Sequence, residues 1–190
     1  MILPIYVYGD PILRVETQEV EGNSEELQQL IDDMVETMRG AAGVGLAAPQ
    51  VGRTERFFVV DLTPMFDDME AEEIEALPQQ PMVFINPEIH WESEEEIEFE
   101  EGCLSIPDLR ELVIRPEGIR IAYLDRRFER QEIEVGSLLA RVIQHEYDHL
   151  DGILFIDHIS PFRRRLLKRR LREMARGNVE ADYPLAVGVS

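Results

Sequence analysis

The sequence predicts an α+β fold in a single domain. Three stretches of the chain have the periodicity and the end residues of helices, and six short runs rich in β-forming residues all lie between the first two of them. Strands that cluster between helices, rather than alternating with them, indicate an α+β plan. With 190 residues, of which 44% are hydrophobic, the chain is long enough to bury one core.

The first two helices are expected over residues 24–38 and about 137–150. Asn23 or Ser24 can cap the first helix, and Gly40 ends it. Apolar residues recur at helical spacing in both segments. The stripe of the first helix consists of Leu27, Leu30, Ile31, Met34, Val35 and Met38. The stripe of the second consists of Leu138, Leu139, Val142, Ile143 and Leu150.

The third helix begins at Ser160, a capping residue that is followed by Pro161 at the first helical position, and it runs to Gly177. The single domain is therefore expected to cover residues 1–177. The remaining residues 178–190 have little pattern, and we expect them to form a flexible tail.

The expected strands are short and lie in the middle of the chain. In Glu96–Glu100 the polar and apolar residues alternate, which places Ile97 and Phe99 on one face of a half-buried strand. Residues 62–81 are acidic and contain three prolines, so we expect an inserted surface loop there. The six expected strands are Arg56–Asp61, Met82–Asn86, Glu96–Glu100, Glu111–Arg115, Ile119–Leu124 and Gln131–Val135.

The charge and the composition exclude several classes of protein. The formal net charge of −20 argues against a protein that docks its whole surface on nucleic acid, and we expect no sequence-specific DNA binding. A single cysteine excludes a disulfide scaffold, and no apolar stretch approaches the length of a membrane span. The first residues do not resemble a secretory signal. We therefore expect a cytoplasmic protein without membrane contact.

Residues 145–149 have the sequence HEYDH, the clearest chemical motif in the chain. On a helix, His145 and His149 share one face and can reach a single metal ion. Glu146 is close enough to act on a metal-bound water without being a ligand. The alternative is a solvated helix face with two incidental histidines, but the neighbouring apolar stripe places these groups next to the core.

A catalytic metal site of this kind usually has three protein ligands. A histidine six residues after His149 would fit one class of zinc peptidase, but Phe155 occupies that position. A carboxylate on a later helix would fit another class, and Glu173 is the one acidic residue there. Cys103, in the sequence EGCLSIP just after an expected strand, is the better third ligand, although a lone cysteine is more often an inert buried residue.

Three separated motifs carry a family resemblance: GVGLAAPQ at 43–50, EGCLS at 101–105 and QHEYDHLDG at 144–152. In this order they resemble the peptide deformylases, metal-dependent hydrolases that remove the N-formyl group from the formylmethionine of nascent polypeptides. The resemblance covers about residues 1–155. It implies antiparallel or mixed sheets packed around a central helix that carries HEYDH, with one helix near each end of the chain. The acidic residues 62–81 and Arg141, where we expected an apolar residue, depart from the pattern.

The resemblance also implies roles for individual residues. A metal-bound water would attack the formyl carbon, with Glu146 as general base and then as acid. Gln50 and the backbone N–H of Leu104 would stabilise the charge on the formyl oxygen. The expected ligands of one divalent ion are Cys103, His145 and His149. Fe²⁺ is expected natively, and Zn²⁺, Ni²⁺ or Co²⁺ can replace it.

The expected substrate contacts rest on the same resemblance. The backbone of Val44, Gly45 and Gly102 would pair with the peptide like an added strand. Further contacts are expected from three residues: Glu101 and Val142 in the methionine pocket, and Arg110 near the downstream end of the peptide. Outside the cleft, Arg115 would hold Glu101 by an ion pair, and Asp148 would accept a hydrogen bond from a metal-bound imidazole. Turn glycines, a core valine and surface ion pairs are the ordinary alternatives.

Residues 163–176 hold eight cations and one anion, against a strongly acidic remainder of the chain. This helix either pairs with acidic neighbours in the same molecule or, as the resemblance suggests, docks on the ribosome near its exit tunnel. Two other functions stay open at this point, a zinc endopeptidase and a ribosome-associated RNA-binding domain with a structural metal. Glu146 favours an enzyme, because a structural site needs no base beside its metal.

Overall fold

Five antiparallel strands form the main sheet of the computed structural model, which describes residues 1–187. In order across the sheet they are β2 (Gly45–Ala47), β3 (Phe57–Val60), β4 (Met82–Glu92), β7 (Ile119–Leu124) and β8 (Arg130–Val135). Four of these match expected strands, with β4 extending further than predicted. β2 lies in the glycine-rich motif at 43–50, where no strand was expected, because a strand of three residues is too short to show a period.

Two helices sandwich this sheet, and the fully buried β3 explains how. Successive side chains of a strand point to opposite faces. Phe58 and Val60 pack with the apolar stripe of α3 (Ser137–Leu150), while Phe57 and Val59 pack with that of α1 (Glu25–Gly40). Both helices match the prediction. Ser24, one of the two candidate caps, accepts a hydrogen bond of 3.1 Å from the N–H of Leu27.

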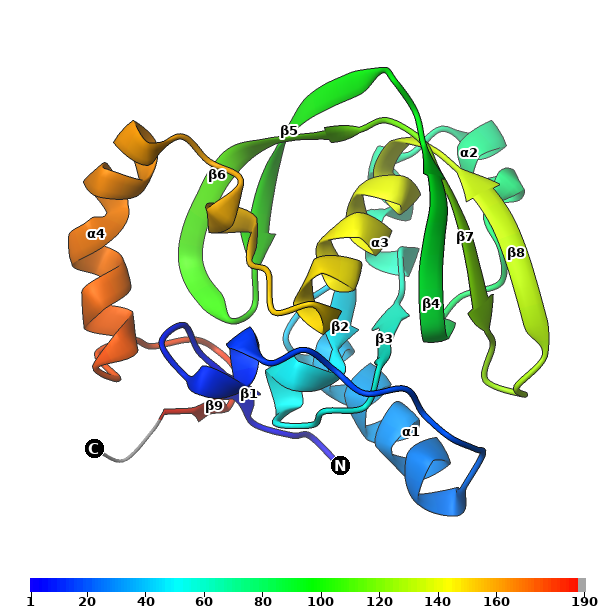
Figure 1. Ribbon diagram of the computed structural model, residues 1–190, viewed down its shortest axis with the longest axis horizontal. Helices are drawn as coiled ribbons and strands as arrows, with labels where there is room; N and C mark the ends of the chain where they lie inside the picture. Colours follow the sequence, from blue (N-terminus) through cyan, green and yellow to red (C-terminus); the bar gives the residue numbers. More distant parts are fainter. Residues whose placement is uncertain (188–190) are drawn as a thin grey trace.

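A two-stranded antiparallel ribbon covers the other side of α3. It consists of β5 (Glu96–Cys103) and β6 (Ile106–Pro116), which are both longer than expected because their ladder of hydrogen bonds continues to the turn at Leu104 and Ser105. The helix that carries HEYDH therefore lies between the ribbon and the main sheet (Figure 1), the arrangement that the family resemblance implies. Ile97 and Phe99 stay 41% and 45% exposed, because no second layer covers this end of β5.

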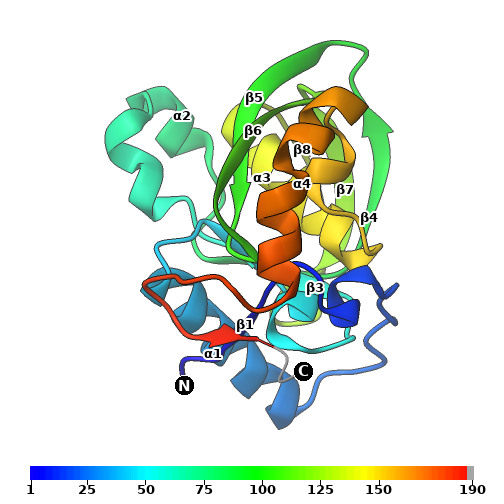
Figure 2. The ribbon, with the colours of Figure 1, turned by 90° about the vertical axis from the view of Figure 1, so that its left-hand side faces the viewer.

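The basic helix α4 (Pro161–Ala175) flanks the ribbon (Figure 2). As predicted, Ser160 caps it and accepts a hydrogen bond of 3.2 Å from the N–H of Arg163. Its buried Leu171 and Met174 join a separate core cluster with Val113 of β6. The helix is thus anchored on one side and open to solvent on the other.

The acidic insertion 62–81 is not an open loop, contrary to the prediction. It contains a 3-10 helix, Thr63–Asp68, and the short helix α2 (Ala71–Ala76). Pro64 is compatible with helix because it lies in the first turn, where a backbone N–H is not needed. The residues of α2 are good helix formers, and its six residues are too few to show a period.

The C-terminal tail also differs from the prediction. Strand β9 (Leu185–Ala186) pairs in parallel with β1 (Ile5–Tyr6), so the described part of the tail, 178–187, is folded back on the domain (Figure 2). The rest of the expected tail, 188–190, lies outside the described residues. Three more 3-10 helices complete the fold: Pro11–Arg14, Ala48–Val51 and Phe155–Asp157.

Within residues 1–187, each helix is too short or too polar to cross a bilayer.

Candidate metal centre and active site

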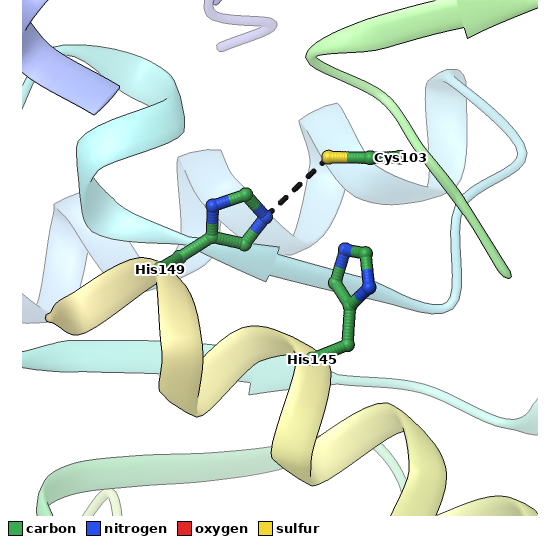
Figure 3. A group of neighbouring side chains, drawn as sticks. All are labelled: Cys103, His145 and His149. Carbon is green, nitrogen blue, oxygen red and sulfur yellow. Dashed lines mark hydrogen bonds between the residues drawn. The ribbon is translucent and has the colours of Figure 1, made fainter. Parts of the chain in front are cut away.

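Three side chains converge beside α3 to form a candidate metal centre (Figure 3). Cys103 ends β5, and His145 and His149 lie one helical turn apart on α3. The three potential ligand atoms lie within 4.8 Å of one another, and the Cys103 Sγ is 3.4 Å from the His149 Nε2. Among residues 1–187 this is the one group of three or more His, Cys, Asp or Glu side chains so arranged. The structure therefore brings together the three predicted ligands.

The chemistry of this cluster suits a divalent metal ion. One thiolate and two imidazoles are typical ligands of zinc and of iron. Burial and the neighbouring His145 keep the pKa of His149 well below its ordinary value, which favours the neutral imidazole that a metal requires. The Nδ1 of His145 lies 2.8 Å from Glu101, so its Nε2 is the atom left for a metal.

Glu146 lies next to the cluster without being part of it. Its side chain is buried, and its Oε2 has no hydrogen-bond partner among the described residues. Burial raises the pKa of Glu146 to about 7, so its carboxyl can both accept and release a proton near neutral pH. Gly45 on β2 leaves the space for it, since a Cβ there would lie 2.7 Å from the Glu146 Cγ. An isolated, buried carboxyl of this kind is suited to proton transfer.

Gln50 and Leu104 lie beside Cys103. Gln50 is buried, and its Oε1 accepts a hydrogen bond of 2.9 Å from the N–H of Ala47. This leaves its Nε2 to face the Oγ of Ser105 at 3.1 Å and the Sγ of Cys103 at 3.5 Å. Leu104 and Ser105 form the turn between β5 and β6. Ser105 is a contact that the sequence reasoning missed, although it stands within the EGCLS motif.

A cleft of about 870 Å³ opens in front of the cluster. Its walls come from the glycine-rich segment before β2, the end of β5, the start of β6, and α3. All six expected substrate contacts line it: Val44, Gly45, Glu101, Gly102, Arg110 and Val142. Arg141, which the sequence marked as a departure from the family pattern, also lines it, as does Tyr183, which we did not predict.

A buried charge cluster supports the metal side of the cleft. Both oxygens of Glu101 accept hydrogen bonds from Arg115, at 2.7 and 3.0 Å, which agrees with the expected ion pair. Arg141 adds a third hydrogen bond of 2.8 Å to Glu101. Burial alone would raise the pKa of Glu101, but hydrogen bonds from His145 and Arg115 hold that pKa well below its usual value. Glu101 therefore stays ionised and orients the imidazole of His145.

Asp148 does not accept a hydrogen bond from a cluster imidazole, contrary to our expectation. Its Oδ2 pairs with Arg115 at 2.8 Å and with the Nε2 of His158 at 2.7 Å. Successive residues of a helix point about 100° apart, so Asp148 cannot face the same side of α3 as its neighbour His149. Glu101, which we assigned to the methionine pocket, is the carboxylate that contacts His145 instead.

The residues considered for other zinc sites lie elsewhere. Phe155 is buried, and its ring lies against that of His145 with 5.9 Å between centroids. It supports the cluster by packing and offers no ligand atom. Glu173 pairs with Arg176 and with Asn178. Neither residue belongs to the Cys103, His145 and His149 group.

The roles of Glu101 and Arg141 that we missed had detectable sequence patterns. In an alternating strand, Glu101 has the same parity as Ile97 and Phe99 and therefore points to the same face, toward α3. Arg141 precedes His145 by four residues and shares its side of the helix. Tyr183 showed no such pattern. It lies in the segment 178–190, where the sequence has no periodicity from which a contact could be predicted.

Comparisons with known proteins agree with this site. The family model described as polypeptide deformylase matches residues 2–165. A peptide deformylase from Salinibacter ruber is 68% identical over 97% of this chain and 94% of its own length. Another from Christiangramia forsetii is 46% identical over 97% of this chain and 95% of its own length.

Solved structures show the same fold. The crystal structure of a peptide deformylase from Legionella pneumophila matches with a TM-score of 0.80 and 40% identity, over 94% of this chain and 98% of that one. A peptide deformylase from Synechococcus elongatus, in complex with actinonin, matches with a TM-score of 0.78 and 38% identity, over 88% and 87% of the two chains. With the Cys/His/His cluster and its neighbouring carboxyl in place, these matches show that the chain belongs to the peptide deformylase family, whose members remove the N-formyl group from nascent peptides.

Proposed function

We propose that this chain deformylates N-formylmethionyl peptides with one Fe²⁺ held by Cys103, His145 and His149, and with Glu146 as the proton-transfer group. The observation that supports this most directly is the position of an unpartnered buried carboxyl oxygen beside three convergent ligand atoms. Zn²⁺, Ni²⁺ or Co²⁺ can occupy the same ligands, because a thiolate and two imidazoles accept each of them.

A divalent ion bound there supplies a Lewis acid and lowers the pKa of a water molecule. Glu146 accepts the proton of the attacking water and then delivers it to the departing amine nitrogen, so that formate and a free amino terminus result. The Nε2 of Gln50 and the N–H of Leu104 donate hydrogen bonds to the formyl oxygen as charge develops on it. Ser105 holds the Gln50 amide by its hydrogen bond of 3.1 Å, so that donor is oriented before the substrate arrives.

The cleft positions the peptide by its backbone. Val44, Gly45 and Gly102 offer main-chain groups at the cleft wall, where an extended peptide pairs as an added strand. Val142 and the end of β5 enclose the methionine side chain. Arg110, about 60% exposed and bound to Glu100 at 3.1 Å, lies where the peptide leaves the cleft.

The test is release of formate from formyl-Met-Ala-Ser by protein purified without oxygen, with metal content measured in parallel. Glu146→Ala is expected to lower turnover by at least about 100-fold while the metal content stays unchanged, because proton transfer by a positioned group contributes about 10²–10⁴-fold. Glu173→Ala, which changes a carboxyl remote from the cluster, is the matched control. Equal turnover by Glu146→Ala and the native chain would contradict the mechanism, and no turnover by the native chain would contradict the function.

We also propose that α4 docks on the ribosome near the exit tunnel in the cytoplasm, where formylated chains emerge. Arg163 pairs with Glu111 at 2.8 Å and Arg164 lies 3.4 Å from Asp157, so these two serve the fold. Four other cations of α4 make neither an ion pair nor a side-chain hydrogen bond with any residue of the described part, and the exposed Phe162 and Leu166 add apolar area beside them. These cations are Arg165, Lys168, Arg169 and Arg172.

Co-sedimentation with ribosomes at increasing salt tests this docking. We expect binding by the native chain to fall steeply with salt, since phosphate contacts release counterions. The triple variant R165A/R169A/R172A is expected to bind at least about 10-fold more weakly at low salt. Its matched control, R120A/R126A/R130A, removes three exposed arginines from outside α4. Equal losses in both variants would indicate non-specific attraction and would refute a docking role for the helix.

A further inference from the structure

The C-terminal segment after α4 forms part of the active-site cleft. Four of its residues line the cleft: Glu180, Ala181, Asp182 and Tyr183. All four lie beyond residue 165, where the match to the family model ends. The segment therefore belongs to the site by position, although no sequence motif assigns it a role.

Contacts with the N-terminal segment hold this part of the chain in place. The N–H of Ile5 donates a hydrogen bond of 2.9 Å to the carbonyl of Pro184, and the parallel pairing of β1 with β9 follows directly. Gly9 permits a close approach to the end of α4, since a Cβ there would lie 2.6 Å from the Ala175 Cα. Tyr183, adjacent to these anchors, therefore has a defined position.

Tyr183 contacts the turn that carries the expected oxyanion donor. Its hydroxyl donates a hydrogen bond of 2.8 Å to the carbonyl oxygen of Leu104. Burial raises the pKa of Tyr183 to about 12, so the hydroxyl keeps its proton at neutral pH and remains a donor. The carbonyl and the N–H of Leu104 flank the same Cα, so a hydrogen bond that holds the carbonyl limits movement of the turn that carries the N–H.

The same two-residue turn is held from two other directions. The N–H of Tyr8 donates a hydrogen bond of 2.8 Å to the carbonyl of Ser105, and the Nε2 of Gln50 donates one of 3.1 Å to the Ser105 Oγ. Tyr183 supplies the one such hydrogen bond to Leu104 from outside the ribbon among the described residues. The turn is thus fixed at both residues. Tyr183 of the C-terminal segment holds Leu104, the residue whose N–H is expected to face the substrate.

We propose that Tyr183 is a positioning residue, which holds the Leu104 turn so that the Leu104 N–H meets the formyl oxygen in the transition state. This inference rests on the proposed function. A hydrogen-bond donor that acts on charge developing in the transition state changes kcat more than it changes the binding of substrate. The C-terminal segment is accordingly a working part of the enzyme rather than a tail.

The test uses Tyr183→Phe in the full-length, metal-loaded protein, with formyl-Met-Ala-Ser as substrate. We expect kcat to fall about 3- to 10-fold, the factor that corresponds to one ordinary hydrogen bond, while KM changes less than about twofold. Amide hydrogen exchange gives a readout that does not depend on activity. Peptides that cover residues 103–106 are expected to exchange faster in Tyr183→Phe than in the native chain.

Tyr123→Phe is the matched control. Tyr123 is buried where Tyr183 is half-buried, its pKa is also raised to about 12 by burial, and its hydroxyl makes no hydrogen bond with any residue of the described part. It lies on β7, away from the cleft. We expect this variant to match the native chain in kcat and in exchange at 103–106.

Two outcomes would overturn the inference. One is a Tyr183→Phe variant with native kcat and native exchange at 103–106. The other is a raised KM at native kcat, which would make Tyr183 only a wall of the cleft. If the native chain releases no formate, the proposed function is wrong. Faster exchange at 103–106 in Tyr183→Phe would then still show that Tyr183 holds the Leu104 turn, so the two failures can be told apart.

Discussion

Two buried arginines, Arg115 on β6 and Arg141 on α3, carry the same charge as the arginines of α4 but lie in the opposite surroundings. Arg115 and Arg141 are only 4% and 7% exposed, and their guanidinium groups bond to carboxylates and to backbone carbonyls. On α4, Arg165, Arg169 and Arg172 face solvent. Burial makes an arginine costly to leave unpaired, so the first group determines local structure. Exposure makes the second group weak in stabilising the fold and free for a partner.

The largest predicted effect comes from Arg115→Met. This change leaves Glu101 with fewer donors and takes from Asp148 a hydrogen bond of 2.8 Å. Because breaking a buried ion pair leaves an uncompensated charge, we expect a loss of about 3–5 kcal/mol in the free energy of unfolding. Urea denaturation measures this loss.

Arg120→Met is the matched control for that experiment. Arg120 also pairs with a carboxylate, Glu134 at 2.8 Å, and lies over an aromatic ring, that of Trp91 at 5.8 Å. Its side chain is 45% exposed, so we expect a change below about 1 kcal/mol. Similar losses in both variants would mean that burial does not separate the two kinds of arginine.

Arg141→Met is predicted to have the second-largest effect. Besides Glu101, Arg141 donates to the carbonyls of Ile97 at 2.5 Å and Val113 at 2.9 Å, and it lies 5.7 Å from the Phe99 ring. It thereby ties β5 to α3 across the cleft. Methionine keeps the length of the side chain but donates no hydrogen bond, so we expect a loss of about 2 kcal/mol.

Steady-state kinetics sharpen this second prediction. If Arg141 sets the spacing of β5 and α3, KM for formyl-Met-Ala-Ser should rise about 3- to 10-fold with little change in kcat. An unchanged KM in a variant that is destabilised would restrict Arg141 to a role in stability.

The ion pair between Asp61 and Arg39 is intermediate between the buried and the exposed pairs, because only one of its partners is buried. The carboxylate is buried and the arginine side chain is 53% exposed. Hydrogen bonds from Thr63 and Arg39 outweigh burial and lower the pKa of Asp61 below 3.8. We expect Asp61→Asn to cost about 1 kcal/mol at pH 7.

The pH dependence of that cost follows from the direction of the shift. A lowered folded-state pKa stabilises the protein above the unfolded value of 3.8, and the contribution disappears as the pH falls through the lower folded value. The difference in unfolding free energy between the native chain and Asp61→Asn should therefore be constant from about pH 7 to 5 and shrink in more acidic solution. A difference that grows toward acid would contradict this.

The smallest predicted effect concerns α4. Because exposed charges contribute little, R165A/R169A/R172A should change the free energy of unfolding by less than about 0.5 kcal/mol. Thermal and urea denaturation measure this change, and a large loss would show that these arginines serve the fold.

Much of the site could be predicted because its information is local. The spacing of His145 and His149 is a property of any helix, and GVGLAAPQ and EGCLS are contiguous motifs. The same reasoning, applied strictly, would have excluded Asp148 as a partner of His149 and favoured Glu101 as the residue facing α3. Those two errors came from incomplete use of the helix and strand periods, not from missing information.

Other features could not be predicted for physical reasons. A strand of two or three residues, such as β2 or β9, has no measurable period, and its pairing depends on a partner far away in the chain. Helix α2 is also too short, and the prolines and acidic residues of the surrounding segment 62–81 resemble those of a loop. The exposure of Ile97 and Phe99 depends on whether another layer covers β5, which alternation cannot reveal.

By itself the sequence determined the α+β class, the helices at both ends, and the residues able to bind a metal, since periodicity and motif spacing act within a few turns. The tertiary structure alone decided that Glu101 orients His145, that Arg141 joins β5 to α3, and that Tyr183 reaches Leu104. These contacts join residues 44 to 79 positions apart. Only packing of the ribbon, the central helix and the folded-back terminus brings such distant groups within hydrogen-bond distance.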